Sequence, residues 1–449
     1  MSEPIAADLR LDPAWLIPVS PEGVAIEGQA LIVHEGRIID ILPTVEADFR
    51  YDAAQQLRLP GHALIPGFVN LHTHAAMTLL RGYADDLPLM TWLNDYIWPA
   101  ERQWVSADFV YDGTRLACLE MLKGGITCFN DMYFFPEAAV EAATEAGQRI
   151  AAGIIVIDFA SNYAADPDGY LQKGLALRDA MRHHPLVSFC MAPHAPYSVG
   201  DRSLEKVLTY AKQLDLPIHI HVHETEDEIR ASLAQYGVRP LARLHGMGLL
   251  GPDFIAVHAV HLEAAEMALM AEYGCHVAHC PTSNLKLGSG IARSATLLAR
   301  GVNVGLGTDG PASNNRLDPW QEMRLAALLA KGVSGQAEAL AAPTVLRMAT
   351  RDGARALGLE DRIGTLEPGK QADLVAVDLS GPHTQPCFDP LSQLVYSAGR
   401  QDVTHVWIAG RELVRDRCCL TLDEAEILAS AQLWRQRLTD TTLPKRPSA

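Results

Sequence analysis

The chain has 449 residues, of which 48% are hydrophobic and 20% are charged, a balance typical of an enzyme with a large buried core. Its formal net charge of −17 argues against nucleic acid or an anionic membrane as a partner, because either would need a basic surface. The N-terminal MSEPIAADLRLDP does not resemble a signal peptide, no segment resembles a membrane-spanning helix, and the eight cysteines include no C-x-x-C pair. We therefore expect a cytoplasmic protein with reduced thiols rather than a disulfide framework or a cysteine-zinc site.

The two ends of the chain carry β-strand patterns. Residues 25–42 alternate between apolar and polar side chains around a Glu-Gly turn, and residues 372–377 and 405–414 have a similar texture, which is typical of hairpins. We predict one small β-sandwich domain made from residues 1–65 and 366–449, with a closing helix near residues 422–438.

Between these ends, residues 66–365 are predicted to form the catalytic domain. Strand-like segments alternate there with amphipathic helical segments such as 137–147, 201–213, 226–236, 263–273 and 292–301. The predicted strands are 67–72, 126–132, 150–159, 186–193, 217–223, 254–261, 276–280 and 303–308. Eight such units favour an α/β fold of the (β/α)8 TIM-like barrel type over an open sheet. No G-x-G-x-x-G follows a strand, which argues against dinucleotide binding.

Histidines gather at the ends of the predicted barrel strands. His72 and His74 end the first strand, and because strand side chains alternate with period two, both imidazoles lie on one face and can share a metal ion. In the fifth strand His219, His221 and His223 share one parity, which predicts that all three point to the same side. Three inward histidines are costly unless chemistry uses them.

The later strands end in the same kind of residue. His258 and His261 lie on the predicted sixth strand and His279 on the seventh. Asp309 follows the eighth strand in a Thr-Asp-Gly sequence, which by itself could be an ordinary turn. Barrel enzymes place their chemistry at these strand ends. Imidazoles together with a carboxylate suit one Zn²⁺, with Fe²⁺ or Mn²⁺ as alternatives, and such an ion lowers the pKa of a bound water.

The expected number of metal ions is one. Binuclear barrels often bridge their ions with a carboxylated lysine, but the predicted fourth strand, residues 186–193, has no lysine, and the nearest one, Lys173, lies in a predicted helix. We therefore expect one divalent ion per chain. Glu224, which directly follows the histidines of the fifth strand, is a nearby carboxylate that can move protons.

Five segments together resemble one superfamily: PGFVNLHTH, HVHET, HAVHL, HCPTSNLKLGSG and GTDGPASNN. They are similar to the amidohydrolase superfamily, in its branch of aminohydrolases that act on ring amines, and the similarity covers nearly the whole chain. Residues 81–101, RGYADDLPLMTWLNDYIWPAE, resemble in particular the members that deaminate 5′-methylthioadenosine and S-adenosylhomocysteine. The resemblance implies metal-dependent deamination of the adenine amino group, which releases ammonia and leaves the inosine analogue.

The resemblance also implies roles for individual residues. It selects His221 as the strand-five ligand, because His221 stands three residues before Glu224, and it gives as metal ligands His72, His74, His221 and Asp309. Glu224 would protonate a ring nitrogen, His258 would orient the attacking hydroxide, and Asp309 would take its proton.

Substrate contacts are implied for Trp92, Glu101 and His194, besides Glu224 and Asp309. Glu101 suits a pair of ribose hydroxyls because a carboxylate accepts two hydrogen bonds, although without the resemblance it would be interpreted as a solvated helix residue. Trp98 and Trp104 are interpreted as lid packing. His223, His261 and His279 are interpreted as supporting groups.

Two other classes stay open. A guanine or cytosine deaminase or an s-triazine hydrolase would use the same metal ligands, but Glu101 is a reason to expect a ribose. A non-catalytic scaffold would be expected to lose ligands. Related enzymes hold the homocysteine carboxylate with arginines, yet Arg149 is the only arginine between Arg115 and Arg178, which favours methylthioadenosine. We expect a small nucleoside as partner and assembly into a homo-oligomer.

Overall fold

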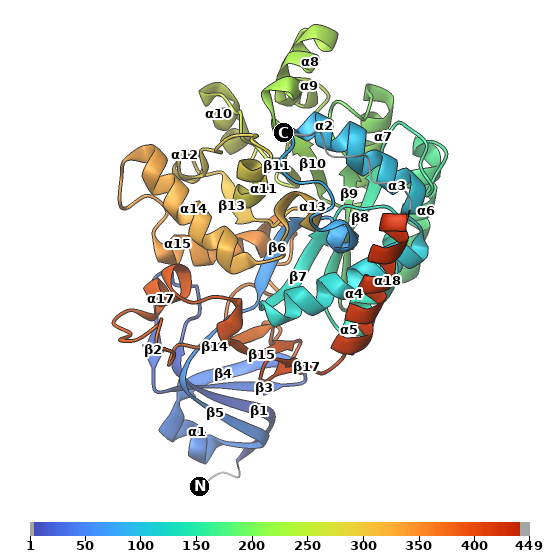
Figure 1. Cartoon of the computed structure of the whole chain (residues 1–449). Coiled ribbons are helices and arrows are strands. Elements are labelled where there is room, and N and C mark those ends of the chain that lie inside the picture. The colour runs from blue at the N-terminus through green and yellow to red at the C-terminus, as the bar shows by residue number, and fades with distance from the viewer. Residues whose placement is uncertain (1–3, 441–449) are drawn as a thin grey trace.

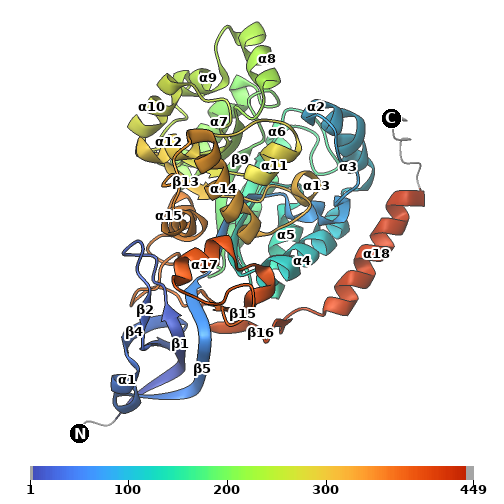
Figure 2. The same cartoon turned by 60° about the vertical axis from the view of Figure 1, so that its left-hand side comes forward.

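The computed structural model describes residues 4–440, and two sheets organise them (Figure 1). One sheet has eight strands in consecutive order and is parallel throughout, and the other has nine strands of mixed direction. Helices surround the parallel sheet, whereas the mixed sheet lies at one end of the molecule, as Figure 2 also shows.

The parallel sheet curls into the predicted barrel. Its strands are β6 (Phe68–Thr73), β7 (Ile126–Asp131), β8 (Arg149–Val156), β9 (Val187–Pro193), β10 (Ile218–Val222), β11 (Phe254–His258), β12 (His276–His279) and β13 (Asn303–Leu306). The first and last strands meet where the Asp309 N–H donates to the His72 carbonyl at 3.0 Å. The (β/α)8 prediction is confirmed.

The sixth barrel strand, β11, ends at His258, three residues earlier than the predicted strand 254–261. His258 and Ala259 have φ values of 70° and 49°, a left-handed conformation that no β-strand can continue through. The chain therefore turns at His258, so that His261 lies beyond the strand.

The mixed sheet draws its strands from both ends of the chain, which confirms the predicted composite β-structure. From the N-terminal end come β1 (Ile5–Leu16), β2 (Ile26–Glu27), β3 (Gln29–His34), β4 (Arg37–Pro43) and β5 (Tyr51–Pro66), and from the C-terminal end β14 (Leu374–Asp378), β15 (Val403–Ile408), β16 (Arg411–Arg415) and β17 (Cys418–Cys419). The two sets join where β14 pairs antiparallel with β5. One residue, Gly67, then separates β5 from the first barrel strand.

A buried ion pair joins the barrel to the mixed sheet. Arg149, at the start of β8, donates from Nε and Nη2 to the two carboxylate oxygens of Asp373 at 3.1 and 3.0 Å, and both side chains are at most 3% exposed. Asp373 also accepts the Ala409 N–H at 2.8 Å. Arg149, the arginine singled out in the sequence, is therefore a structural residue between the two sheets.

Most of the α-helices connect or follow the barrel strands, whereas α1, α17 and α18 lie between or after strands of the mixed sheet. They are α1 (Thr44–Arg50), α2 (Leu89–Thr91), α3 (Trp98–Trp104), α4 (Ala107–Lys123), α5 (Pro136–Ala146), α6 (Pro167–Met181), α7 (Asp201–Leu214), α8 (Glu226–Tyr236), α9 (Pro240–Gly246), α10 (Ala264–Glu272), α11 (Pro281–Lys286), α12 (Ser294–Ala299), α13 (Pro311–Asn314), α14 (Pro319–Ser334), α15 (Ala342–Arg347), α16 (Gly353–Ala356), α17 (Pro390–Tyr396) and α18 (Glu424–Asp440). A π-helical turn over Trp92–Ile97 joins α2 to α3. The predicted closing helix is α18, and it lies along α4, where Arg115 pairs with Glu426 (Figure 1).

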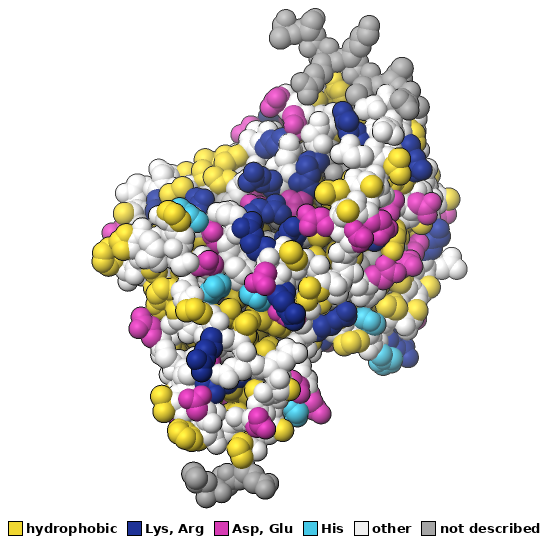
Figure 3. Space-filling model, turned by 60° about the horizontal axis from the view of Figure 1, so that its bottom comes forward, with side chains coloured by type: hydrophobic (Ala, Val, Ile, Leu, Met, Phe, Trp, Pro, Cys, Tyr) yellow, Lys and Arg dark blue, Asp and Glu magenta, His cyan; other side chains and the backbone are white. Residues whose placement is uncertain are grey.

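The outer surface carries charges of both signs. On the face that Figure 3 shows, basic and acidic side chains lie beside one another with apolar side chains between them. Within residues 4–440, no helix combines the length and the apolar character needed to cross a membrane.

Candidate active site

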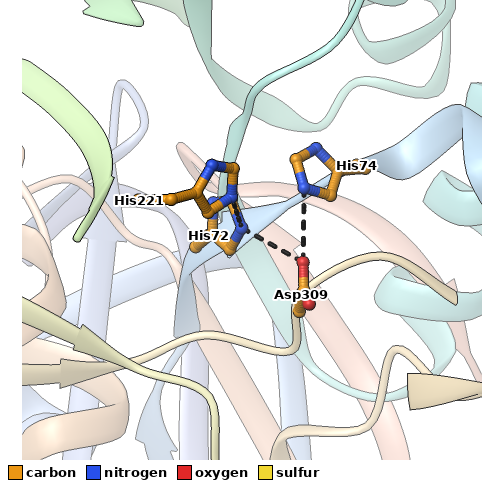
Figure 4. A group of neighbouring side chains, drawn as sticks. All are labelled: His72, His74, His221 and Asp309. Carbon is orange, nitrogen blue, oxygen red and sulfur yellow. Dashed lines mark hydrogen bonds and ion pairs between the residues drawn. The ribbon is translucent and has the colours of Figure 1, made fainter. Parts of the chain in front are cut away.

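Four side chains meet at the carboxyl ends of the barrel strands (Figure 4). His72 lies on β6 and His221 on β10, while His74 and Asp309 follow β6 and β13. The four ligand atoms lie within 4.8 Å of one another. Nε2 of His72 is 3.1 Å from Oδ1 of Asp309 and 3.2 Å from Nε2 of His221, and Nε2 of His74 is 3.3 Å from the same oxygen.

The other ring nitrogen of two of these histidines is held by a backbone carbonyl. Nδ1 of His74 donates to the Met132 carbonyl at 2.5 Å, and Nδ1 of His221 donates to the His194 carbonyl at 2.7 Å. A proton on Nδ1 leaves a lone pair on Nε2, which is the tautomer that a metal ligand needs. These carbonyls thus orient both rings for coordination.

Asp309 is oriented by two hydroxyls. Ser283 and Ser313 donate to its Oδ2 at 2.6 and 2.7 Å, which leaves Oδ1 facing the histidines. Burial opposes the ionised form, but the neighbouring His72 and His74 rings favour it and hold the pKa of Asp309 well below its usual range. The group therefore combines one carboxylate charge with three imidazole nitrogens.

The donor set and its spacing fit one divalent metal ion. Metal bonds of about 2.0–2.1 Å in a tetrahedron place neighbouring ligand atoms about 3.3 Å apart, and the separations in this group are 3.1, 3.2 and 3.3 Å. Nitrogen and carboxylate oxygen ligands suit Zn²⁺ and other first-row ions. These are three of the six pairs, and all four ligand atoms of His72, His74, His221 and Asp309 lie within 4.8 Å of one another, so small side-chain shifts are enough for the group to hold such an ion.

Glu224 and His258 face this group from neighbouring strand ends. Oε2 of Glu224 lies 3.7 Å from Nε2 of His258, and the His258 ring stacks on His221 with centroids 5.4 Å apart. Both side chains are buried, and burial raises the pKa of Glu224 above its ordinary value. A buried carboxyl beside a histidine is placed to exchange a proton with a ligand.

Glu228 fixes the chain that carries Glu224. Its two carboxylate oxygens accept the backbone N–H groups of His223 at 3.0 Å and of Glu224 at 2.9 Å. Glu228 belongs to the first turn of α8, so the helix start and the strand end are tied together. The position of the Glu224 backbone is therefore set by a second acidic residue four positions later.

A cavity of about 70 Å³ opens beside the metal group, and the predicted substrate residues line it. They are Trp92, Glu101 and His194, together with Glu224, His258 and Asp309. Oε1 of Glu101 accepts the Tyr133 hydroxyl at 2.8 Å, and burial raises the pKa of Glu101 to about 7. The indole nitrogen of Trp92 is buried and has no hydrogen-bond partner within residues 4–440, so it can donate to a ligand.

Comparison with known proteins identifies the family. The profile of the amidohydrolase family matches residues 63–413. A 5-methylthioadenosine/S-adenosylhomocysteine deaminase from Teredinibacter turnerae is 48% identical over 438 residues, which cover 98% of this chain and 99% of that protein. The chain belongs to the amidohydrolase family.

Other relatives of this amidohydrolase also act as deaminases. A 5′-deoxyadenosine deaminase from Methanosarcina mazei is 42% identical, covering 95% of this chain and 97% of the relative. The crystal structure of an adenosine deaminase from Xanthomonas campestris, which contains bound zinc, is 49% identical with a TM-score of 0.96, covering 98% of this chain and 100% of that one. The amidohydrolase chain is accordingly an enzyme, a hydrolase of C–N bonds.

One expectation about an individual residue of the amidohydrolase is wrong. His223 does not face the metal group with His219 and His221, because its φ of 57° takes it out of the strand. Its Nε2 instead accepts the Leu241 N–H at 3.0 Å, while Nε2 of His219 lies 3.1 Å from Nδ1 of His72. Trp98 packs edge to face on Phe159 and also lines the cavity beside the metal group, so its predicted role in lid packing stays a prediction.

Several residues that support the site were not singled out in the sequence. They are Tyr133, Glu228, Ser283, Asn284 and Ser313. Ser283 and Asn284 lie within the family motif HCPTSNLKLGSG, and Ser313 lies within GTDGPASNN, so the motifs pointed to the region. Their contacts to Asp309 and His258 could be assigned only once the strands were placed side by side.

Proposed function

We propose that this amidohydrolase removes the 6-amino group of adenine from 5′-modified adenosines, with 5′-methylthioadenosine and S-adenosylhomocysteine as substrates. Water supplies the oxygen, and the products are the inosine analogue and ammonia. The observation that carries the proposal is that Glu101 lines the same cavity as Glu224 and the metal group. An acceptor for ribose hydroxyls and an acid for the purine ring are thus available to one ligand.

The proposed metal ligands are His72, His74, His221 and Asp309. Their spacing and the zinc in the Xanthomonas structure support Zn²⁺ as the native ion. When bound, a divalent ion lowers the pKa of water and so supplies a nucleophile near neutral pH. Within residues 4–440 no other group of three or more possible ligands has this compactness, which supports one ion per chain.

The remaining steps belong to protein side chains. Glu224 donates its proton to the ring nitrogen beside the reacting carbon, where negative charge develops during attack. His258 orients the attacking water through Nε2, and Asp309 accepts the proton that this water loses. The same proton then passes to the amino group, which leaves as ammonia. The second proton of the water returns to Glu224 as the carbonyl forms, so that Glu224 and Asp309 carry all proton transfers and end in their starting states.

Substrate binding uses the wall opposite the metal group. Glu101 accepts hydrogen bonds from the two ribose hydroxyls, which a carboxylate can do with both oxygens. Trp92 offers its indole N–H and an aromatic surface, and His194 contacts the nucleoside beside the ligand His221. Guanine, cytosine and triazines have no ribose for Glu101 to bind, so they are less favoured as substrates than the adenosines.

An ammonia-release assay tests the proposal. The purified enzyme is given 5′-methylthioadenosine, S-adenosylhomocysteine, 5′-deoxyadenosine, adenosine, guanine, cytosine and a triazine, before and after removal of metal with a chelator. We expect release from the adenosines, loss of that release with the chelator, and recovery with Zn²⁺. Release from guanine, cytosine or the triazine alone would show that a different aminohydrolase activity is present.

A further inference from the structure

The carboxylate of Glu101 is held by a single phenol. Tyr133 follows β7, and its hydroxyl donates to Oε1 of Glu101 on α3 at 2.8 Å. The two side chains are only 4% and 8% exposed. Within residues 4–440 the carboxylate makes no other hydrogen bond and no ion pair. Its orientation in the cavity therefore depends on Tyr133.

The backbone beside Tyr133 also supports the metal group. The residue before it, Met132, donates its N–H to the Thr73 carbonyl at 3.0 Å, and its own carbonyl accepts Nδ1 of His74 at 2.5 Å. The rings of Tyr133 and His74 lie near each other, with centroids 6.3 Å apart. The phenol and the proposed metal ligand therefore share one support at the end of β7.

Glu101 itself lies outside the barrel. Its helix, α3, belongs to the segment between β6 and β7. Nδ2 of Asn162 donates to the carbonyls of Arg102 and Val105 at 3.0 Å each, which fixes the backbone at the end of α3. The side chain of Glu101 is joined to the barrel only by the Tyr133 hydroxyl, among the residues that the structure describes.

A reacting nucleoside has to reach the metal group and Glu101 at the same time. Placement errors of about 1 Å are enough to slow a reaction strongly. The phenol takes one acceptor position on Oε1, so Oε2 and the second lone pair of Oε1 stay available to the hydroxyls of a ligand. The distance between the two ends of the bound nucleoside is thus set by where Tyr133 holds this carboxylate.

We propose that Tyr133 is a positioning residue for sugar recognition, because its hydroxyl fixes the Glu101 carboxylate relative to the metal group. Tyr133 acts through Glu101 and takes no part in the proton transfers. The inference rests on the proposed function and deepens it. Selectivity for a sugar with both hydroxyls then belongs to a pair of residues, one at the barrel and one on α3.

The test measures kcat and KM for 5′-methylthioadenosine and for its 2′,3′-dideoxy analogue, which has no hydroxyls for Glu101. The variants are Tyr133→Phe, Glu101→Ala and the two changes combined. Tyr51→Phe is the matched control, because the Tyr51 hydroxyl also donates to a carboxylate oxygen, Oδ2 of Asp40, at 2.8 Å, but in the mixed sheet. Metal content and melting temperature are measured for every variant.

In Tyr133→Phe we expect KM for methylthioadenosine to rise about tenfold or more, as the loss of a hydrogen bond to a charged group implies, with a smaller fall in kcat. KM for the dideoxy analogue should change less than about twofold. In the Glu101→Ala background the same replacement should raise KM no further, because Tyr133 then has no carboxylate to hold. Tyr51→Phe should match the wild type with both compounds.

An equal rise in KM for the two compounds would overturn the role of Tyr133, and so would additive effects of Tyr133→Phe and Glu101→Ala, which would mean that the phenol acts independently of the carboxylate. Loss of metal or of the fold in Tyr133→Phe would overturn it as well, because the hydroxyl would then serve the structure. In each of these cases wild-type release of ammonia from methylthioadenosine leaves the deaminase function intact. If the wild type releases none from any adenosine, the proposed function fails and this role with it.

Discussion

Oδ1 of Asn284 lies 2.8 Å from Nδ1 of His258, and both side chains are buried. An amide oxygen can only accept, so this contact assigns the proton to Nδ1 of His258. Nε2 is then directed toward Glu224, at 3.7 Å. Asn284 lies on α11 and His258 ends β11, so a helix after one strand sets the tautomer of a histidine on its neighbour.

Replacing Asn284 should therefore reduce turnover more than binding. We expect Asn284→Leu to lower kcat by about 10–100-fold, the usual effect of losing a partner that orients an active-site group, with little change in KM. Asn284→Asp retains an oxygen acceptor and should keep more activity. Equal losses in both variants, with melting temperatures like that of the wild type, would contradict this role.

Glu224→Gln should keep the metal and lose the reaction. The amide cannot donate the carboxylic proton to the ring nitrogen, so kcat should fall by about 10²–10⁴-fold, while metal content by elemental analysis stays at the wild-type level. Glu226→Gln, an exposed position two residues away, is the matched control and should behave as the wild type. Near-normal turnover in Glu224→Gln would refute the acid role.

Glu101→Gln should weaken the binding of ribose specifically. The neutral amide has one acceptor oxygen in place of two, so we expect KM for methylthioadenosine to rise about tenfold or more without loss of metal. A 2′,3′-dideoxy analogue, which lacks the hydroxyls that Glu101 is proposed to bind, should be far less affected. A similar rise in KM for both compounds would mean that Glu101 does not contact the ribose.

The ion pair between Arg149 and Asp373 should matter for stability rather than for catalysis. Asp373→Ala leaves the guanidinium buried without its partner, which usually costs about 3–5 kcal/mol, and denaturant unfolding should report that loss. Asp179→Ala, which removes an exposed partner of Arg178, should cost about 1 kcal/mol or less. Equal effects from the two variants would contradict the importance of burial.

Glu322 should make stability depend on pH. Burial raises its pKa from 4.5 to about 7, against hydrogen bonds from Thr282 and Asn314. The unfolded chain releases this proton near pH 4.5 and the folded chain only near pH 7. Stability from this group is therefore complete below about pH 4.5 and falls as the pH rises to about 7, by about 3 kcal/mol.

The measurement is the free energy of unfolding in urea at pH 5 and pH 7. Glu322→Gln cannot ionise, so its stability should fall less between the two values than that of the wild type. Glu338→Gln, on the exposed segment after α14, should keep the wild-type difference. If Glu322→Gln shows the full wild-type difference, the carboxyl does not titrate in this interval.

The sequence by itself determined the barrel and the composite sheet, and its resemblance to the family selected the four proposed metal ligands His72, His74, His221 and Asp309. Strand and helix periodicities arise from local backbone geometry, so they can be recognised in the sequence. The two-residue spacing of His72 and His74 and the apolar patterns of the barrel strands are examples. The proximity of His221 and Glu224 is also a local property, because His221 lies on β10 and Glu224 follows the end of that strand.

Contacts between distant segments were decided only by the tertiary structure. The departure of His223 from the strand depends on a positive φ, and the partners of Asp309 and His258 come from helices that follow other strands. Trp92 and Glu101 line the cavity beside the metal group because the helical segment 89–104 folds against that cavity. Periodicity reports which face a side chain occupies, whereas packing between elements decides what that side chain meets.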